Sequence, residues 1–380
     1  MKKNEINEDS LRTQINQYLM IQGFKINPHL RVEDNKKSTL KKIHQRKRKE
    51  KIKLHNKSLA KNIKIAKKYS ISGKDLEPEK IDLELIEINS NSFYSKLFFW
   101  WNLMWWSLPY DQPVGRQMRF LLWDNHHDCP FGLFYLQSPP LRSAVRDNYL
   151  EINNKNVDYW INQSLYGQRI GAIPPYNELL GGKMVALSLT ANEVRDSYEN
   201  KYQNKKTLLK KRKLPTKLLF TTTTSAYGKS SVYERISYKN EPVSQFLGFT
   251  SGAGTFHISE ELYQKCLKYL EQKDVNVKRG YGTGPSRKMK LMSKAFTHLG
   301  IPQYAYHNIK RGYYLFSNVK NLKDVIRNDS QPLWYNRPFS DLFDFWKERW
   351  CLPRSKRMNT WKNFDSDSFF TSAEKEIREI

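Results

Sequence analysis

The sequence predicts an α/β protein in which a mixed β-sheet is flanked by helices. The run Leu218–Thr224 is apolar and rich in Thr, which is typical of a buried strand, and Gln245–Thr250 has the composition of a second strand. The segment Glu260–Gln272 repeats apolar residues at helical spacing, which indicates an amphipathic helix. A chain of 380 residues is long enough to bury a substantial core.

We expect three regions along the chain. Residues 1–90 are predicted to form a helical, basic extension that ends in an acidic linker. Residues 91–330 are predicted to form the α/β core, and residues 331–380 a basic C-terminal segment. The boundary near residue 90 follows the acidic stretch Asp75–Glu87, in which Pro78 interrupts regular structure. This acidic stretch could dock on the basic extension when no polyanion is bound.

Two helices are predicted in the extension. Ser10–Gly23 has apolar residues at helical spacing and a glycine where a cap is expected. Lys36–Lys68 holds 15 Lys or Arg residues against one acid, Glu50, and contains neither Pro nor Gly. Its apolar residues fall on two stripes that are too narrow for ordinary core packing.

The basic helix has two interpretations. It could be a solvated helix lying over the body, or a cationic arm on a phosphate backbone, because like charges along one helix repel unless a counter-charge is present. We favour the arm. Its predicted contacts are Lys42, Arg46, Arg48, Lys49 and Lys53.

The core begins with a tryptophan-rich run, Leu97–Leu108, that predicts a buried helix or strand. A hairpin follows, and its tip holds His126 and His127. Adjacent histidines point in opposite directions on an extended chain, and no second ligand cluster has matching spacing, so we predict no metal site. The remaining predicted elements are helices at Asp158–Tyr166, Glu178–Thr190 and Asn192–Tyr202, and strands at Arg169–Ile173 and His307–Phe316.

The net charge and the cysteine content limit which partners and which cellular location are expected. The formal net charge of +27 favours a polyanionic partner, with nucleic acid preferred to a membrane surface and DNA preferred to RNA. Three distant cysteines, without a CxxC pair, fit a reducing cytoplasm. The polar start Met1–Asn7 is not a signal peptide, and the apolar run Leu97–Trp106 is too short to span a bilayer.

Charged and hydroxyl side chains gather at the ends of the predicted strands, where open α/β sheets bind ligands. The turn Ser225–Ser231 could hold a phosphate or a carbonyl oxyanion, or Ser230 could simply cap the following helix. Gly181–Gly182–Lys183 could hold an anion or allow a close helix–sheet contact. The predicted nucleic-acid or phosphate contacts are Arg119, Arg142, Arg146, Lys183, Ser225, Lys229, Ser231, Arg235, Arg279, Arg287, Lys310 and Arg311.

A catalytic interpretation rests on His257, Tyr233 and Asp147. His257 would act as a general base, and its alternative role is a core histidine bonded to a backbone carbonyl. Asp147 could instead form a structural ion pair with Arg146. We expect Arg119, Arg146 and Asp147 to share one site with Lys229 and Tyr233.

Eight motifs resemble the DruA family of the Druantia anti-phage system, over roughly residues 95–360. They include SLPYDQPVGRQMRFLLWD (107–124), RIGAIPPYNELLGGKMVALSLTANEVRDSYENKY (169–202), LFTTTTSAYGKSSVYERI (219–236), GFTSGAGTFHI (248–258) and WKERWCLPRSKR (346–357). The resemblance implies a component of a bacterial anti-phage defence system that works with other subunits. Together with the charge, it favours binding of nucleic acid.

A second resemblance concerns the fold. The order of elements is similar to the GNAT acyltransferase core: a strand, a helix with Gly181–Gly182, a second strand, and then SSVYERI…FLGF. Tyr233 and Gly248–Phe249 stand at the matching places. It implies a GNAT-like core and leaves open an acyl-CoA cofactor, although the acyl-CoA loop pattern occurs only at Arg279–Gly284 and not after Ile173. Three functions therefore stay open: a nucleic-acid-binding subunit, an enzyme (acyltransferase or nuclease), and a scaffold that recruits other defence proteins.

Overall fold

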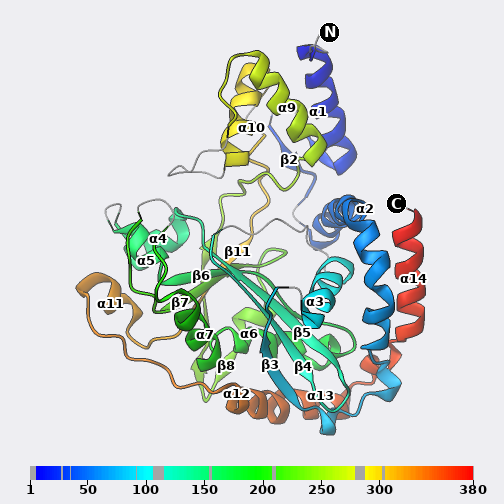
Figure 1. Ribbon diagram of the computed structural model, residues 1–380, viewed down its shortest axis with the longest axis vertical. Coiled ribbons are helices and arrows are strands. Elements are labelled where there is room, and N and C mark those ends of the chain that lie inside the picture. Colours follow the sequence, from blue (N-terminus) through cyan, green and yellow to red (C-terminus); the bar gives the residue numbers. More distant parts are fainter. Residues whose placement is uncertain are drawn as a thin grey trace.

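The centre of the molecule is a seven-stranded mixed sheet (Figure 1). The structure, a computed structural model, describes residues 6–26, 29–34, 36–90, 92–105, 115–153, 156–207, 211–278, 287–301 and 304–379. Neighbouring strands run antiparallel except β6 and β7, which are parallel. The predicted α/β class with a mixed sheet is confirmed. In spatial order the strands are β10 (Ser244–Phe249), β11 (Gly312–Ser317), β7 (Phe220–Thr224), β6 (Ser164–Ala172), β5 (Cys129–Gln137), β4 (Gln117–Asp124) and β3 (Leu83–Glu87).

Helices cover both faces of the sheet. On β6, Arg169 donates a hydrogen bond of 2.8 Å to Asn102 of α3 (Phe93–Met104), whereas Ala172 lies against Gly181 of α6 (Gly181–Ser188). Because side chains of residues an odd number apart on a strand point to opposite faces, α3 and α6 lie on opposite sides of the sheet. The other elements of the body are α4 (Ala144–Leu150), α5 (Val157–Ile161), α7 (Asn192–Tyr202), α8 (Ser231–Glu234), β8 (Ser237–Tyr238), β9 (Glu241–Pro242), α11 (Leu322–Asn328), α12 (Phe339–Trp346), a π-helical turn (Lys347–Cys351), α13 (Leu352–Arg357) and α14 (Ser366–Glu379).

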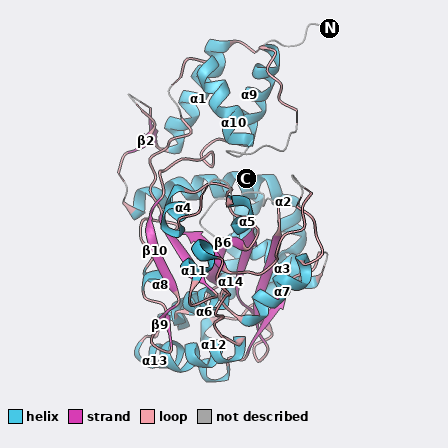
Figure 2. Ribbon diagram, turned by 90° about the vertical axis from the view of Figure 1, so that its left-hand side faces the viewer, coloured by secondary structure: helices cyan, strands magenta, loops and turns pink. Residues whose placement is uncertain are grey.

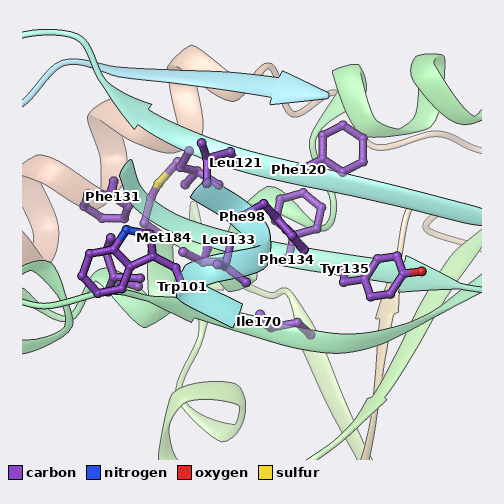
Figure 3. Packing of buried hydrophobic residues seen from close by; sticks show 14 of the residues in the cluster. Phe98, Trp101, Phe120, Leu121, Phe131, Leu133, Phe134, Tyr135, Ile170 and Met184 are labelled. Atoms are coloured by element: carbon purple, nitrogen blue, oxygen red, sulfur yellow. The ribbon is translucent and has the colours of Figure 1, made fainter. Parts of the chain in front are cut away.

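The tryptophan-rich run is part of the main core up to Trp105, as predicted, and its last three residues lie outside the described residues. Trp100 and Trp101 of α3 are fully buried, and Trp101 stacks on Phe369 of α14 with ring centroids 5.5 Å apart. Figure 3 shows the same core continuing across the sheet, where Phe120 and Phe134 of neighbouring strands stack at 4.8 Å. Aromatic rings thus anchor the C-terminal helix to the sheet through α3.

A separate helical lobe stands at one end of the body (Figures 1 and 2). It contains α1 (Glu8–Gln22), the short strands β1 (Phe24–Lys25) and β2 (Arg31–Val32), α9 (Glu260–Gln272) and α10 (Arg287–His298). Its own apolar cluster joins residues of α1 to residues of α9 and α10. The lobe is built from the N-terminus and from the segment between β10 and β11, two strands that are neighbours in the sheet. Gly23 caps α1 in the left-handed conformation, as expected.

The basic helix α2 (Lys37–Lys68) joins the two parts. Leu40 and Ile43 belong to the core of the helical lobe, whereas Ile52, Leu59 and Ile63 belong to the main core. The prediction that its apolar stripes are too narrow for core packing is therefore wrong. The start of α2 packs on the lobe, and its later part packs on α3 and α14. A narrow apolar stripe is enough for each part, because each part is covered on one side only.

Several predicted boundaries need correction. The acidic stretch ends in β3, which pairs with β4, so these residues are part of the sheet. Its Glu87 pairs with Lys201 at 2.8 Å, and Glu77 pairs with Lys80, so neither acid docks on α2. The predicted helix Asp158–Tyr166 ends at Ile161 because its second half enters β6. The predicted strand His307–Phe316 begins only at Gly312.

Gly181 offers a direct test of the packing of α6 on the sheet. A Cβ atom at Gly181 would lie 2.6 Å from the Ala172 Cβ and 2.6 Å from the Tyr176 carbonyl oxygen. We expect Gly181→Ala to lower the free energy of unfolding by about 1–3 kcal/mol, as overpacked cores do. Urea titration followed by circular dichroism measures this change.

Gly182→Ala is the matched control. The nearest atom to a Cβ at Gly182 is a Val232 methyl at 3.9 Å, which is ordinary van der Waals contact. Since alanine also favours helix, this variant should be as stable as the native protein or slightly more stable. Equal destabilisation by both substitutions would contradict the close-contact argument.

Candidate nucleic-acid interface

One face of α2 carries a continuous row of cations. A helix turns once every 3.6 residues, so residues spaced by three or four positions share a face. Eight exposed basic residues have this spacing, and they extend about 39 Å at about 1.5 Å per residue. We name this row the α2 stripe: Lys42, Arg46, Lys49, Lys53, Lys57, Lys61, Lys64 and Lys68.

The described carboxylates do not neutralise the charge of the α2 stripe. Among the described residues, no carboxylate forms an ion pair with any of its eight cations. Successive members lie one turn apart, where like charges repel each other. The helix therefore holds a row of cations that an external polyanion would stabilise.

Arg48 differs from the other predicted arm residues. Its guanidinium pairs with Glu376 of α14 at 2.7 Å and donates to the carbonyl oxygens of Leu103 and Met104, which end α3. Arg48 thus ties α2 to α3 and α14 rather than facing outward. Lys47 is also internal: it is buried and pairs with Glu50 at 2.5 Å.

The turn Ser225–Ser231 uses two of its three serine hydroxyls in hydrogen bonds to the backbone. The Ser225 hydroxyl accepts a hydrogen bond of 2.9 Å from the Gly312 amide and donates to the Gly228 carbonyl. The Ser230 hydroxyl accepts from the Tyr233 amide at 3.4 Å and so caps α8, which was the alternative interpretation of this turn. Ser231 is exposed at the start of α8.

Lys229, in the same turn, is half-exposed. Its ammonium pairs with Glu234 at 3.1 Å and lies 4.5 Å from the centre of the Phe246 ring. The ion pair and the ring position the side chain at the surface beside α8. An anion that binds here would compete with Glu234 for the ammonium group.

The single site expected from Arg119, Arg146, Asp147, Lys229 and Tyr233 is not formed. Tyr233 packs on Tyr314 and Phe316 of β11, whereas Leu150 of α4, the helix that carries Arg146, clusters with Leu315. Side chains alternate along β11, so α4 and α8 lie on opposite faces of the sheet.

Arg146 itself is fully buried. It pairs with Asp147 at 2.6 Å and donates to the carbonyl oxygens of Pro140 and Leu141. The structural ion pair, one of the two roles considered for these residues, is the one observed. Of the other predicted contacts, Arg142 is exposed before α4 and Arg119 is half-buried on β4.

Two predicted residues do come together. The Lys183 ammonium donates a hydrogen bond of 2.8 Å to the Arg235 carbonyl and lies 4.3 Å from the centre of the Trp350 ring. Burial lowers the pKa of Lys183, and the nearby Arg235 and Arg349 lower it further. No local sequence pattern connects Arg349 or Trp350 with Lys183, because only the fold brings the π-helical turn to α6.

The three catalytic candidates lie apart. His257 is fully buried between the lobe and the body, where its Nε2 atom is 2.6 Å from the Tyr304 carbonyl oxygen, as in the core-histidine alternative. Burial lowers the pKa of His257 to about 3 and raises the pKa of Tyr233 above its usual range. Asp147 is the partner of Arg146 on α4.

The remaining predicted contacts lie near the lobe. Lys310 is exposed, and Arg287 is half-buried at the start of α10. Arg311 has its guanidinium 5.2 Å from the centre of the Phe256 ring and 3.3 Å from Nε2 of His44. Arg279 and the glycines of its loop lie outside the described residues.

The hairpin-tip histidines interact with nearby acids. Nδ1 of His127 is 2.7 Å from Asp124, and His126 faces Glu77 at 3.7 Å. In the described part of the chain, no group of three or more His, Cys, Asp or Glu side chains is arranged to hold a metal ion.

Three buried histidines at the lobe–body junction predict acid sensitivity. Burial lowers the pKa of His44 and His257 to about 3 and that of His307 to about 2, and Arg311, Lys47 and Lys288 add like charge. Unfolded histidines titrate near 6.5, so below this pH the unfolded chain binds protons that the folded protein does not. Stability should therefore fall as the pH drops from about 6.5 towards 3, by about 1.4 kcal/mol per pH unit for each histidine.

Urea unfolding between about pH 7.5 and 5.5 tests this effect, because few carboxylates titrate in that window. His257→Asn should reduce the slope of stability against pH by about one third. A stability that stays constant across the window would contradict the assignment of these histidines as neutral in the folded protein.

The family model of Druantia protein DruA matches residues 34–328, which include α2 and all seven strands of the sheet. Druantia protein DruA of Escherichia coli (strain UMEA 4076-1) is 28% identical over 313 residues, which cover 80% of this chain and 77% of that protein.

No solved structure matches the chain. Among the described helices, none combines the length and the apolarity needed to cross a membrane. The match to the family model covers well over half of the sequence, from the basic helix to the last helix before the C-terminal segment. The chain therefore belongs to the Druantia protein DruA family.

Proposed function

We propose that this protein is a nucleic-acid-binding component of a Druantia anti-phage defence system and that it contacts DNA through the α2 stripe. The observation that supports this proposal is the row of eight exposed cations on one face of α2, without ion pairs to described carboxylates. Family membership supports the defence role. The net charge of +27 supports a polyanionic partner.

The dimensions of the α2 stripe suit a duplex. Its length of about 39 Å is close to one turn of B-DNA, which rises about 34–36 Å. Lysines and arginines that meet phosphates displace condensed counterions, so the affinity depends steeply on salt and little on sequence. The inner face of α2 is buried in both cores, so the stripe is already in place before the ligand arrives.

The location and the partners are part of the same proposal. We place the protein in the cytoplasm, together with other subunits of the defence system. The buried free thiols of Cys129, Cys266 and Cys351 suit a reducing compartment. A scaffolding role would use surfaces other than the α2 stripe.

A GNAT-like core remains a proposal about the fold. What supports it is α8 with Tyr233, which precedes β10 with Gly248 and Phe249. Acyl transfer has less support from the side chains. Tyr233 is packed against β11, and the Nε2 atom of His257 already faces a backbone carbonyl.

Neutralising half of the α2 stripe tests the proposed function. We expect Lys42→Gln, Arg46→Gln, Lys49→Gln and Lys53→Gln, combined in one variant, to weaken DNA binding at low salt. The slope of log K against log salt should become shallower by about 3.6, because each lost phosphate contact removes about 0.9. Two unrelated duplexes and an RNA duplex, measured by fluorescence anisotropy, show whether the loss is independent of sequence and whether DNA is preferred.

The control variant removes the same charge elsewhere. Lys213, Lys217, Lys239 and Lys356 are exposed and lie on other elements. Their change to Gln should leave the salt slope nearly unchanged. An equal effect of both variants would mean that net charge alone governs binding, and it would contradict a defined interface.

Deleting residues 1–70 is a poorer test, since it would also expose the apolar faces of α9 and α3.

Lys229 is proposed as a second contact. We expect Lys229→Ala to reduce DNA binding or anti-phage protection while the melting temperature stays within about 1 °C, because its exposed ion pair contributes little stability. Glu234→Gln removes the competing carboxylate and keeps the ammonium, so this control should bind at least as well as the native protein. Full protection by Lys229→Ala at normal expression would exclude the turn as a site.

A further inference from the structure

A second surface that combines cations with an exposed aromatic ring lies on the helical lobe, on elements other than α2. A pocket of about 610 Å³ is formed between the outer face of α10 and one aromatic side chain of the segment that leads back to the body. This volume lies within the range of small-ligand sites. The residues that matter are Lys290, Ser293, Lys294 and Thr297 of α10, with Tyr306 opposite.

Tyr306 presents its ring to solvent from a fixed backbone. Its side chain is 54% exposed, whereas its neighbours Ala305 and His307 are buried at 1% and 4% exposure. Its backbone pairs with Ala253 in an isolated β-bridge. The His307 amide also donates a hydrogen bond of 2.9 Å to Gly252. The backbone at Tyr306 is therefore held by its neighbours, while the ring remains accessible.

The wall opposite the ring is cationic. Lys290 and Lys294 are exposed and lie one helical turn apart, so both ammonium groups can reach the mouth of the pocket. No ion pair joins either of them to a carboxylate of the described chain. The Thr297 hydroxyl, which donates to the Ser293 carbonyl at 3.0 Å, lies in the same wall.

We propose that this pocket binds an unpaired base of single-stranded nucleic acid. The base stacks on Tyr306, and the flanking phosphates lie against Lys290 and Lys294. An aromatic platform beside cations is the combination with which proteins hold single strands, because every base has a flat π-face and every nucleotide a phosphate. In an intact duplex the base faces are covered by their neighbours, so the ring selects unpaired nucleotides.

The inference rests on the proposed function and refines it. The α2 stripe can contact phosphates only and so does not distinguish paired from unpaired strands. The pocket adds this distinction, since stacking requires a free base. A protein with both surfaces would prefer a junction of duplex and single strand, such as an unwound or resected end.

The test compares binding of a labelled single strand of about 20 nucleotides and of the corresponding duplex by fluorescence anisotropy at fixed salt. Tyr306→Ala should weaken single-strand binding about tenfold, within the range for loss of one stacked base, and change duplex binding less than about twofold. Tyr306→Phe keeps the ring and should bind like the native protein. Lys290→Gln combined with Lys294→Gln should lower the single-strand salt slope by about 1.4.

The outcomes separate the two proposals. Single-strand binding by Tyr306→Ala at native strength would overturn the pocket, and the α2 stripe variant would still test the proposed function. A parallel loss in Tyr306→Phe would also overturn it, because stacking does not need the hydroxyl. If the native protein bound neither nucleic acid, both proposals would fail. Quenching of a 2-aminopurine base in the single strand by native protein and by Tyr306→Phe, but not by Tyr306→Ala, supports stacking directly.

Discussion

The arrangement of the lobe and the body depends on the apolar contacts that fix α2 between them. A helix with 15 basic residues over the segment Lys36–Lys68 and one acid repels itself along its length. Burial of its inner side offsets this repulsion, first by Leu40 and Ile43 in the lobe and then by Ile52 and Leu59 in the main core. The same contacts fix which side faces outward. A row of cations at the surface is thus a consequence of apolar packing on the opposite side of the helix.

Local sequence patterns correctly predicted the helices whose bounds are set by residues close in the sequence. The helices at Glu260–Gln272 and Asn192–Tyr202 have the expected bounds, because periodicity and caps act within a few residues. The start of β6 and the start of β11 were misplaced, since pairing with distant strands decides where a strand begins. No local signal shows that the lobe combines α1 with helices more than 200 residues away.

The candidate interface was predictable only in part. Lys42, Arg46, Lys49 and Lys53 share the exposed face that helical spacing assigns to them. Arg48 was misassigned, because its partner Glu376 is 328 residues away and α14 has to dock before the ion pair exists. The motif-dense turn at Ser225–Ser231 has many hydroxyls, yet backbone groups of β11 and α8 occupy two of them. The polar residues of this motif therefore serve the fold as well as any ligand contact.

The position of the lobe in the chain has a consequence for biosynthesis. Leu11, Ile15 and Leu19 leave the ribosome before their partners on α9 and α10, which are made more than 240 residues later. Until then the apolar side of α1 can pack only on β1, β2 and the start of α2, and the part that contacts α9 and α10 stays uncovered. Contacts of such long sequence separation form slowly and leave apolar surface exposed in the interval. We therefore expect the nascent chain to depend on chaperone protection of α1, and the sheet to be complete only after α9 and α10 have been made, because β11 follows them in the chain.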